Sequence, residues 1–412
     1  MSTRQITMIE VRALGGSGEY LRNCYLLEAD GHCFLLDCGV KRILAPEKEV
    51  YPLLTPSLAG RIEAVFLSHA HEDHTAALPY LVALGYQGPV YGSAPTISFA
   101  RGFMQKWMSY VTGHDCRVPF DASCIDRVNL LPLSLGTQRV SGVPLVCGRS
   151  GHMLGSMWYQ FLFASGSVLY TGDTTKDGYL LACDPYPQSD VLVVDSAYAD
   201  TVLSQEAQYA SLSAQCKEVV SKGGSVLLPV PANGRGSDIF LFLARQALPL
   251  VVEKSIVEKT SALACCGSWT KFPVEIPSCI VADEQNRAEL PLAGKVILAP
   301  DGMLTSPIGL SYLSRLGNDA SSKVILTGYV SEGTMGWQLL HGTCSYALQA
   351  SSVTIKVHPD QEEVMRIVGE VRPAKVMLFH APLSQSTSLI ASLRAKKLEV
   401  ACGLTEPLVF GR

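Results

Sequence analysis

Seven consecutive residues, Ser68 to His74, hold the densest group of chemically active side chains in the sequence. They read Ser-His-Ala-His-Glu-Asp-His, which places three of the nine histidines beside two acids. His69 and His71 are two residues apart, so on an extended segment their rings can point the same way and hold one metal ion. Asp73 and His74 follow where the chain turns and could hold a second ion. Imidazole and carboxylate are ligands that zinc takes, so this segment predicts a zinc site rather than a solvated loop.

The elements around this segment must deliver it to one end of a sheet. The apolar run at 62–67 predicts a buried strand that ends where the histidines begin. Residues 75–86 predict the next helix, in which Pro79 is tolerated near the first turn. Upstream, the apolar run at 33–36 predicts another strand, and Asp37 stands at its end. On its own, Asp37 indicates only a turn where that strand stops.

Further polar side chains stand at the ends of later predicted strands. Glycines flank His152, which is typical of a tight loop that presents the ring. Asp173 follows a short apolar strand, and Asp195 ends the apolar run at 190–195. Functional sites collect at strand ends along one rim of an α/β sandwich. We therefore expect these side chains to meet His69 there.

From residue 205 onward, helical and apolar stretches alternate. The sequence predicts a helix at 205–221, a strand at 224–230 and a helix at 237–248. This alternation is typical of a doubly wound α/β domain. The chain then continues through a strand at 353–360, a helix at 361–371 and a strand at 375–379 that leads into His380.

A helix predicted at 96–111 carries aromatic residues at helical spacing. They are Phe99, Phe103, Trp107 and Tyr110. Such a stripe is more often part of a core than a ligand site, so we expect it to be buried.

Length and composition limit the possible functions. The 412 residues indicate two domains or one domain with a large insertion, and a net charge of −4 excludes a broad basic surface. Any nucleic acid would be held locally, by metals and a few cationic side chains. The thirteen scattered cysteines predict a reduced, cytoplasmic chain. The start at Met1–Gln5 leads into a strand-like run without a signal-peptide core, and no apolar run is long enough to span a membrane.

His-x-His-x-Asp-His after a strand resembles the signature of the metallo-β-lactamase superfamily, whose members are mostly hydrolases. The segments at 229–235, 302–304 and 328–336 resemble motifs of the β-CASP domain. That domain is inserted into the metallo-β-lactamase fold in a family of nucleases that includes ribonuclease J and the endonuclease of pre-mRNA 3′-end processing. The resemblance implies an α/β fold, in which an αββα sandwich carries an inserted α/β β-CASP domain. It places the sandwich at 1–204 and 349–412 and the β-CASP domain at 205–348, a short form without appended RNA-binding domains.

The resemblance also implies a site with two zinc ions per chain. Its implied ligands are His69, His71, His152 and Asp173 for the first ion, and Asp73, His74, His380 and Asp173 for the second. Asp37 would support the metal loop from behind the ligands. Catalytic roles fall on Asp73, on His358 at the scissile phosphate, and on Asp195, which would orient His358.

Two positions depart from the family pattern. Lys356 stands where the family often has a serine that touches phosphate, and Ala381 replaces the usual glycine after the last histidine. Lysine could still bind phosphate as a point charge, so Lys356 and Arg235 are candidate substrate contacts.

The sequence therefore predicts a zinc-dependent ribonuclease that hydrolyses RNA phosphodiester bonds through a metal-activated water, in endonucleolytic or 5′-exonucleolytic mode. The expected partner is single-stranded RNA, with DNA as an alternative, and no membrane is involved. A homodimer is compatible with the sequence, which does not fix the oligomeric state. Other hypotheses are a DNA nuclease of the same fold, a lactonase or thioesterase, and a non-catalytic RNA-binding scaffold subunit. The β-CASP segments argue against the small-molecule hydrolases, and the complete ligand set argues against the scaffold.

Overall fold

The computed structural model describes residues 8–404 and 407–411, so the predicted start at Met1–Gln5 lies outside the described residues. The chain divides into two compact units. Unit 1 comprises Met1–Lys176, Cys183–Val202 and His358–Arg412, and unit 2 comprises Asp177–Ala182 and Leu203–Val357. Of the helices in the described ranges, none combines the length and apolar character that crossing a membrane requires.

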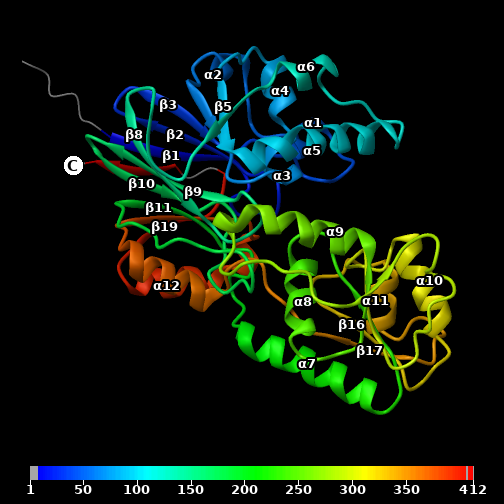
Figure 1. The fold of residues 1–412 in the computed structure, drawn as a ribbon. Coiled ribbons are helices and arrows are strands. Elements are labelled where there is room, and N and C mark those ends of the chain that lie inside the picture. Colours follow the sequence, from blue (N-terminus) through cyan, green and yellow to red (C-terminus); the bar gives the residue numbers. More distant parts are fainter. Residues whose placement is uncertain (1–7, 405–406, 412) are drawn as a thin grey trace, which may run out of the picture. The chain divides into compact units, whose positions relative to one another are not determined.

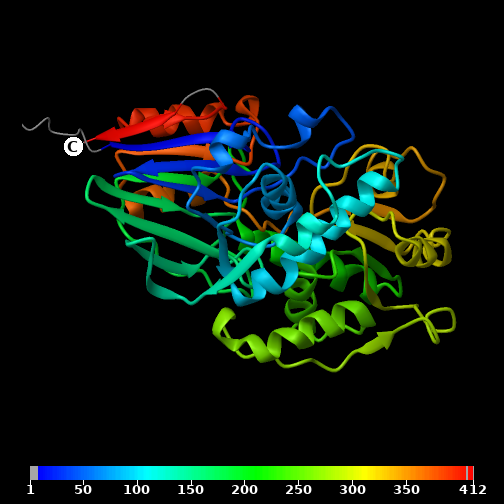
Figure 2. The ribbon, with the colours of Figure 1, turned by 90° about the horizontal axis from the view of Figure 1, so that it is seen from above.

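Unit 1 is built on two seven-stranded sheets. The first has the order β20 (Leu408–Gly411), β1 (Met8–Gly15), β2 (Cys24–Ala29), β3 (His32–Leu36), β4 (Ala64–Phe66), β5 (Pro89–Ser93) and β6 (Asn129–Leu133). The second has the order β19 (Glu399–Ala401), β18 (Lys375–Phe379), β11 (Val191–Asp195), β10 (Gly166–Tyr170), β9 (Met157–Phe163), β8 (Val143–Arg149) and β7 (Gly136–Val140). Strands from both ends of the chain pair in the first sheet, where β20 lies antiparallel beside β1 (Figure 2).

Aromatic side chains fill the space between these two sheets. Phe34 of the first sheet stacks on Phe161 of the second with ring centroids 5.8 Å apart, and Phe66 meets Phe161 edge-on at 4.9 Å. Tyr25 of the first sheet packs against Tyr170 of the second in a tilted arrangement, with ring centroids 5.7 Å apart. Offset and edge-on aromatic pairs add to the stabilisation from buried apolar area, so this layer holds the sheets together.

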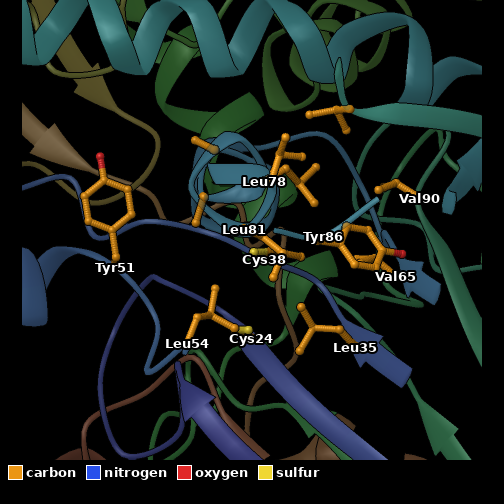
Figure 3. Close-up of a cluster of buried hydrophobic side chains, with 14 of the residues drawn as sticks. Cys24, Leu35, Cys38, Tyr51, Leu54, Val65, Leu78, Leu81, Tyr86 and Val90 are labelled. Carbon is orange, nitrogen blue, oxygen red and sulfur yellow. The ribbon is translucent and has the colours of Figure 1, made fainter. Parts of the chain in front are cut away.

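Helices cover the outer faces of both sheets (Figure 1). The first sheet carries α4 (Leu78–Ala83), α5 (Ala94–Thr112) and α6 (Ser123–Arg127), with the short α1 (Glu47–Val50), α2 (Pro56–Ala59) and α3 (Glu72–Thr75) nearby. Leu78 and Leu81 of α4 pack on Cys38 and Leu35 in the core beneath them (Figure 3). The second sheet carries α12 (Gln361–Val371) and α13 (Thr387–Ala395). The predicted αββα sandwich is confirmed.

Unit 2 is a parallel six-stranded sheet with helices on both faces. Its order is β14 (Ile280–Ala282), β13 (Leu250–Glu253), β15 (Val296–Ala299), β12 (Val226–Pro229), β16 (Lys323–Leu326) and β17 (Gln349–Ser352). One face carries α7 (Gln205–Ser221), α8 (Arg235–Ala244) and α9 (Lys254–Ala262), and the other carries α10 (Pro307–Leu316) and α11 (Met335–Leu340). Burial on both faces explains the continuous apolar runs of its strands.

Two predicted elements differ from the structure. The strand expected at 353–360 is not in a sheet, because β17 ends at Ser352 and the next residues bond only singly, as when Val353 N donates to Leu326 O at 2.8 Å. Its apolar character reflects burial rather than strand pairing. The helix expected at 75–86 is broken between α3 and α4, since Pro79 has no amide hydrogen to continue the helical bonding across the break.

Candidate metal centre

Asp37 fixes the histidine-rich segment from behind. β3 and β4 are parallel neighbours, so Asp37 after β3 and Ser68 after β4 lie at the same edge of the sheet. The Asp37 carboxylate accepts hydrogen bonds from the Ser68 backbone N–H at 2.7 Å and from the Ser68 hydroxyl at 2.6 Å. It also accepts from His74 Nδ1 at 2.6 Å and from the Tyr170 hydroxyl. A proton held on Nδ1 leaves His74 Nε2 as the ligand atom, which turns toward the other candidate ligands.

The first candidate ligand group consists of His69, His71, His152 and Asp173. His71 Nδ1 lies 2.9 Å from His69 Nε2 and 3.3 Å from His152 Nε2. Asp173 Oδ2 lies 3.6 Å from His69 Nε2 and 3.7 Å from His152 Nε2. Four ligand atoms from three separate strand ends therefore converge on one point.

The second candidate group consists of Asp73, His74 and His380, and Asp173 borders it too. His74 Nε2 lies 3.5 Å from Asp73 Oδ2 and 3.2 Å from Asp173 Oδ1. His380 Nε2 lies 3.7 Å from Asp73 Oδ2 and 3.4 Å from Asp173 Oδ2. Asp173 thus stands between both groups, with its two oxygens within reach of each.

The spacing and chemistry of both groups fit metal ions. A tetrahedral ion with bonds of about 2.0–2.1 Å holds its ligand atoms about 3.4 Å apart, which lies inside the observed range of 2.9 to 3.7 Å. His71 Nδ1 faces two ring nitrogens, an approach that a shared cation explains. Asp173 Oδ1 is buried, and no group in the described part of the chain forms a hydrogen bond with it. Buried polar atoms are rarely left so, and a cation would satisfy this oxygen.

Burial and charge set the protonation of these groups. Burial lowers the pKa of His69 well below its usual value and also lowers that of His71, so both rings are neutral, as metal ligands must be. Burial also acts to lower the pKa values of His74 and His380, but the carboxylates around them outweigh it. The pKa of His74 is raised well above normal and that of His380 to about 9. These rings in turn hold the pKa of Asp173 well below its usual value, against its burial.

His358 and Asp195 form a separate pair beside the two groups. His358 Nδ1 lies 2.8 Å from Asp195 Oδ2, and its ring centroid is 4.7 Å from that of His152 and 5.0 Å from that of His380. Asp195 is fully buried and also accepts from the Thr174 N–H at 3.1 Å. His358 joins Asp173 and His380 in a third possible ligand set, but its Nδ1 is engaged by Asp195. The pair can therefore hold or move a proton at His358 Nε2.

Two glycines allow this close convergence. A Cβ on Gly39 would lie 1.6 Å from the backbone oxygen of Asp73, so only glycine lets the two loops meet there. Gly172 has a φ of +54°, and a Cβ on it would lie 2.3 Å from Ser68 Cβ.

Comparison with known families identifies the domains of this chain. The model of the metallo-beta-lactamase superfamily matches residues 17–208, and the model of the Beta-Casp domain matches residues 244–339. The chain therefore combines a metallo-β-lactamase domain with a β-CASP domain.

Relatives of this β-CASP chain are distant in sequence. Transcription termination factor FttA of Methanothermobacter thermautotrophicus is 25% identical over 433 aligned residues, which cover 92% of this chain and 68% of FttA. Integrator complex subunit 11 of Danio rerio is 26% identical over 416, which cover 90% of this chain and 69% of that protein. A solved protein of unknown function from Enterococcus faecalis V583 superimposes with a TM-score of 0.63 at 13% identity, covering 98% of this chain and all of the other, and shows the fold alone.

Sequence reasoning missed one residue of the candidate metal centre, Asn23. Its side chain is fully buried, and Nδ2 lies 2.8 Å from His74 Nε2 and 3.3 Å from Asp73 Oδ2. The Tyr25 hydroxyl donates to Asn23 Oδ1 at 2.9 Å. Asn23 thus orients two candidate ligands. Nothing in its sequence neighbourhood marks it, because the contact joins the residue before β2 to Asp73, fifty residues later in the chain.

Lys356, a predicted substrate contact, is buried and paired with an acid. Its side chain is 1% exposed, and Nζ lies 2.9 Å from Asp177 Oδ2. The Gln205 side chain bonds to both its backbone N and O at 3.0 Å. These contacts give Lys356 a structural role within unit 2, and its contact with a substrate phosphate stays a prediction.

We expect Lys356→Ala to destabilise unit 2 without weakening RNA binding by the folded protein. It removes the ion pair with Asp177, and loss of one partner of a largely buried pair costs about 3 kcal/mol of unfolding free energy. Urea unfolding and RNA fluorescence anisotropy would measure the two effects. The matched control is Lys356→Met with Asp177→Asn, which removes both charges and should recover most of the stability. Weaker RNA binding by folded Lys356→Ala would contradict this structural role.

Arg235, the first residue of α8, joins the three β-CASP motif segments of unit 2. Its guanidinium leaves no room for a side chain at Gly328, whose Cβ would lie 2.2 Å from Nη1. Nη2 would lie 3.6 Å from a Cβ on Gly302, and Nη1 donates to Ile355 O at 3.5 Å. This close approach favours glycine at 328, whereas the separation at 302 is an ordinary van der Waals contact. Its contact with substrate stays a prediction.

Proposed function

We propose that this β-CASP chain is a metal-dependent nuclease that hydrolyses phosphodiester bonds of single-stranded RNA. The observation that carries the proposal is the pair of candidate ligand groups that meet at Asp173 in unit 1. Two divalent cations held there, for which zinc suits the ligands, would supply an activated water and charge for the phosphoryl oxygens. The names of the relatives, a transcription termination factor and an Integrator subunit, favour RNA over a small-molecule substrate.

The chain's own residues would do the remaining work. His358 has its Nδ1 committed to Asp195, so its Nε2 can give a proton to the leaving oxygen or bond to a phosphate oxygen. Asp195 holds the ring in that orientation. Asp37 and Asn23 hold His74 and Asp73 so that the second group keeps its geometry.

A direct cleavage assay tests the proposal. Zinc-loaded protein is incubated with a 5′-labelled single-stranded RNA, with a DNA of the same sequence, and beside a His69→Ala variant. We expect the parent to cut RNA and the variant to be silent, because His69 is a candidate ligand of the first group. Mononucleotide release would indicate a 5′-exonuclease, and internal fragments an endonuclease. A parent protein that binds two ions per chain and cuts no RNA would contradict the proposal.

A further inference from the structure

Helix α5 buries only part of its aromatic stripe. Met104 and Trp107 face the core, and Trp107 Nε1 donates to the Tyr51 hydroxyl at 3.0 Å. Phe99, which the sequence placed in the core with Trp107, is 40% exposed. The expected core role therefore holds for Trp107 and not for Phe99.

Four side chains share the other face of α5. They are Phe99, Phe103, Lys106 and Tyr110, here called the α5 stripe. Their spacing of four, three and four residues places them in a line along one side of the helix. Phe99 and Lys106 are exposed, and Phe103 and Tyr110 are half-buried.

This stripe begins at the candidate metal centre and alternates rings with cations. The Phe103 ring lies 5.8 Å from the ring of His71, a candidate ligand of the first group. Lys106 Nζ lies 4.9 Å from the centre of the Phe103 ring. Further along, Arg42 lies 4.2 Å over the Tyr110 ring. All these residues belong to unit 1.

We infer that the α5 stripe binds single-stranded RNA, with bases stacked on Phe99 and Phe103 and a backbone phosphate near Lys106. Stacking platforms interleaved with cations are how proteins hold single strands without reading sequence. The net charge of −4 requires such cations to act locally, and Lys106 stands on the stripe itself, whereas Arg42 over Tyr110 is also paired with Glu72. Phe103 touches His71, so a strand on the stripe would continue into the proposed site. The inference rests on the proposed nuclease function.

The Kd for RNA, measured without added metal, tests this inference independently of cleavage. The test variants are Phe99→Leu, Phe103→Leu and their combination, which keep apolar volume but lose the ring. Each lost base stack should raise the Kd of a short 5′-labelled single-stranded RNA about five- to hundredfold. Phe103→Tyr keeps the ring and should bind like the parent. Leu162→Ala, at an exposed leucine on β9, is the matched truncation control and should also bind like the parent.

A second set of variants tests the cation. Lys106→Ala should weaken RNA binding and lower the salt slope of log K by about 0.7, as expected for one lost phosphate contact with a single strand. Lys396→Ala, an exposed lysine after α13, should change neither quantity.

The outcomes separate the two ideas. If the parent binds and cuts RNA while the Leu variants keep its Kd, the stripe is overturned and the nuclease function stands. If the parent neither binds nor cuts RNA, both are overturned. Metal content is measured on every variant and should equal that of the parent. Loss of bound metal in Phe103→Leu would show that Phe103 supports His71, and would overturn the stacking role.

Discussion

Asp173→Ala is expected to lower metal binding at both candidate groups in one step. Asp173 is 1% exposed, and its oxygens lie 3.2 Å from His74 Nε2 and 3.6 Å from His69 Nε2. Without it, the first group has no carboxylate, and the second keeps only Asp73 to offset the charge of two adjacent cations. Loss of a mere supporting partner costs about 10- to 100-fold in metal affinity or activity, so loss of this shared ligand should exceed that range.

Metal stoichiometry and RNA cleavage would measure the effect of Asp173→Ala. Asp190→Asn is the matched control. Asp190 precedes β11, at the end of that strand away from Asp195, and its carboxylate accepts hydrogen bonds from the Ser167 N–H and hydroxyl. Circular dichroism must show that both variants fold. Retention of two ions per chain in folded Asp173→Ala would rule out its position as the shared ligand.

His358→Ala should abolish most turnover while metal content stays at the parent level. His358 Nδ1 is engaged by Asp195 at 2.8 Å, and Nδ1 is 3.9 Å from Asp173 Oδ2, so we expect a proton-transfer or phosphate role and not a ligand role. Removal of a positioned general acid costs about 10²- to 10⁴-fold in rate. Single-turnover RNA cleavage at saturating protein would isolate that step from substrate binding.

Two comparisons sharpen the test of His358. His341→Ala, at an exposed histidine in unit 2 that stacks on Trp337, should leave the rate unchanged. Asp195→Asn should slow cleavage too, because an amide no longer favours a proton on His358 Nδ1. Loss of an ion in His358→Ala would instead favour the alternative set of Asp173, His358 and His380.

Local sequence patterns predicted where the candidate ligands lie. Asp37, Asp173 and Asp195 each stand at the end of an apolar run, and the structure places each of them at the end of a parallel-paired strand. Asp173 and Asp195 stand at the ends of neighbouring parallel strands of the second sheet, whose carboxyl ends meet at one edge, whereas Asp37 follows a strand of the first sheet and contacts the second through Tyr170. The roles of Asp173 as a ligand, of Asp37 in supporting the metal loop and of Asp195 in orienting His358 stay predictions.

Other features depended on partners distant in the sequence. The sequence around Lys356 suggests a cation available for substrate, because its partner Asp177 is distant in the chain and only the fold brings the two together. Asn23 belongs to no sequence motif. Its role depends on its contact with His74, which is distant in the sequence. Helical spacing revealed the rings of α5, but could not tell that Trp107 turns inward to Tyr51 while Phe99 turns outward.

The position of Asp37 between the two sheets bears on whether the chain folds before or after it binds metal. Asp37 follows a strand of the first sheet, and its partner Tyr170 ends a strand of the second. The candidate ligands are divided in the same way, with His69 after β4 and Asp173 after β10. Before the sheets dock, neither ligand group is complete. Metal loading should therefore follow folding, in contrast to small zinc domains whose metal nucleates the fold.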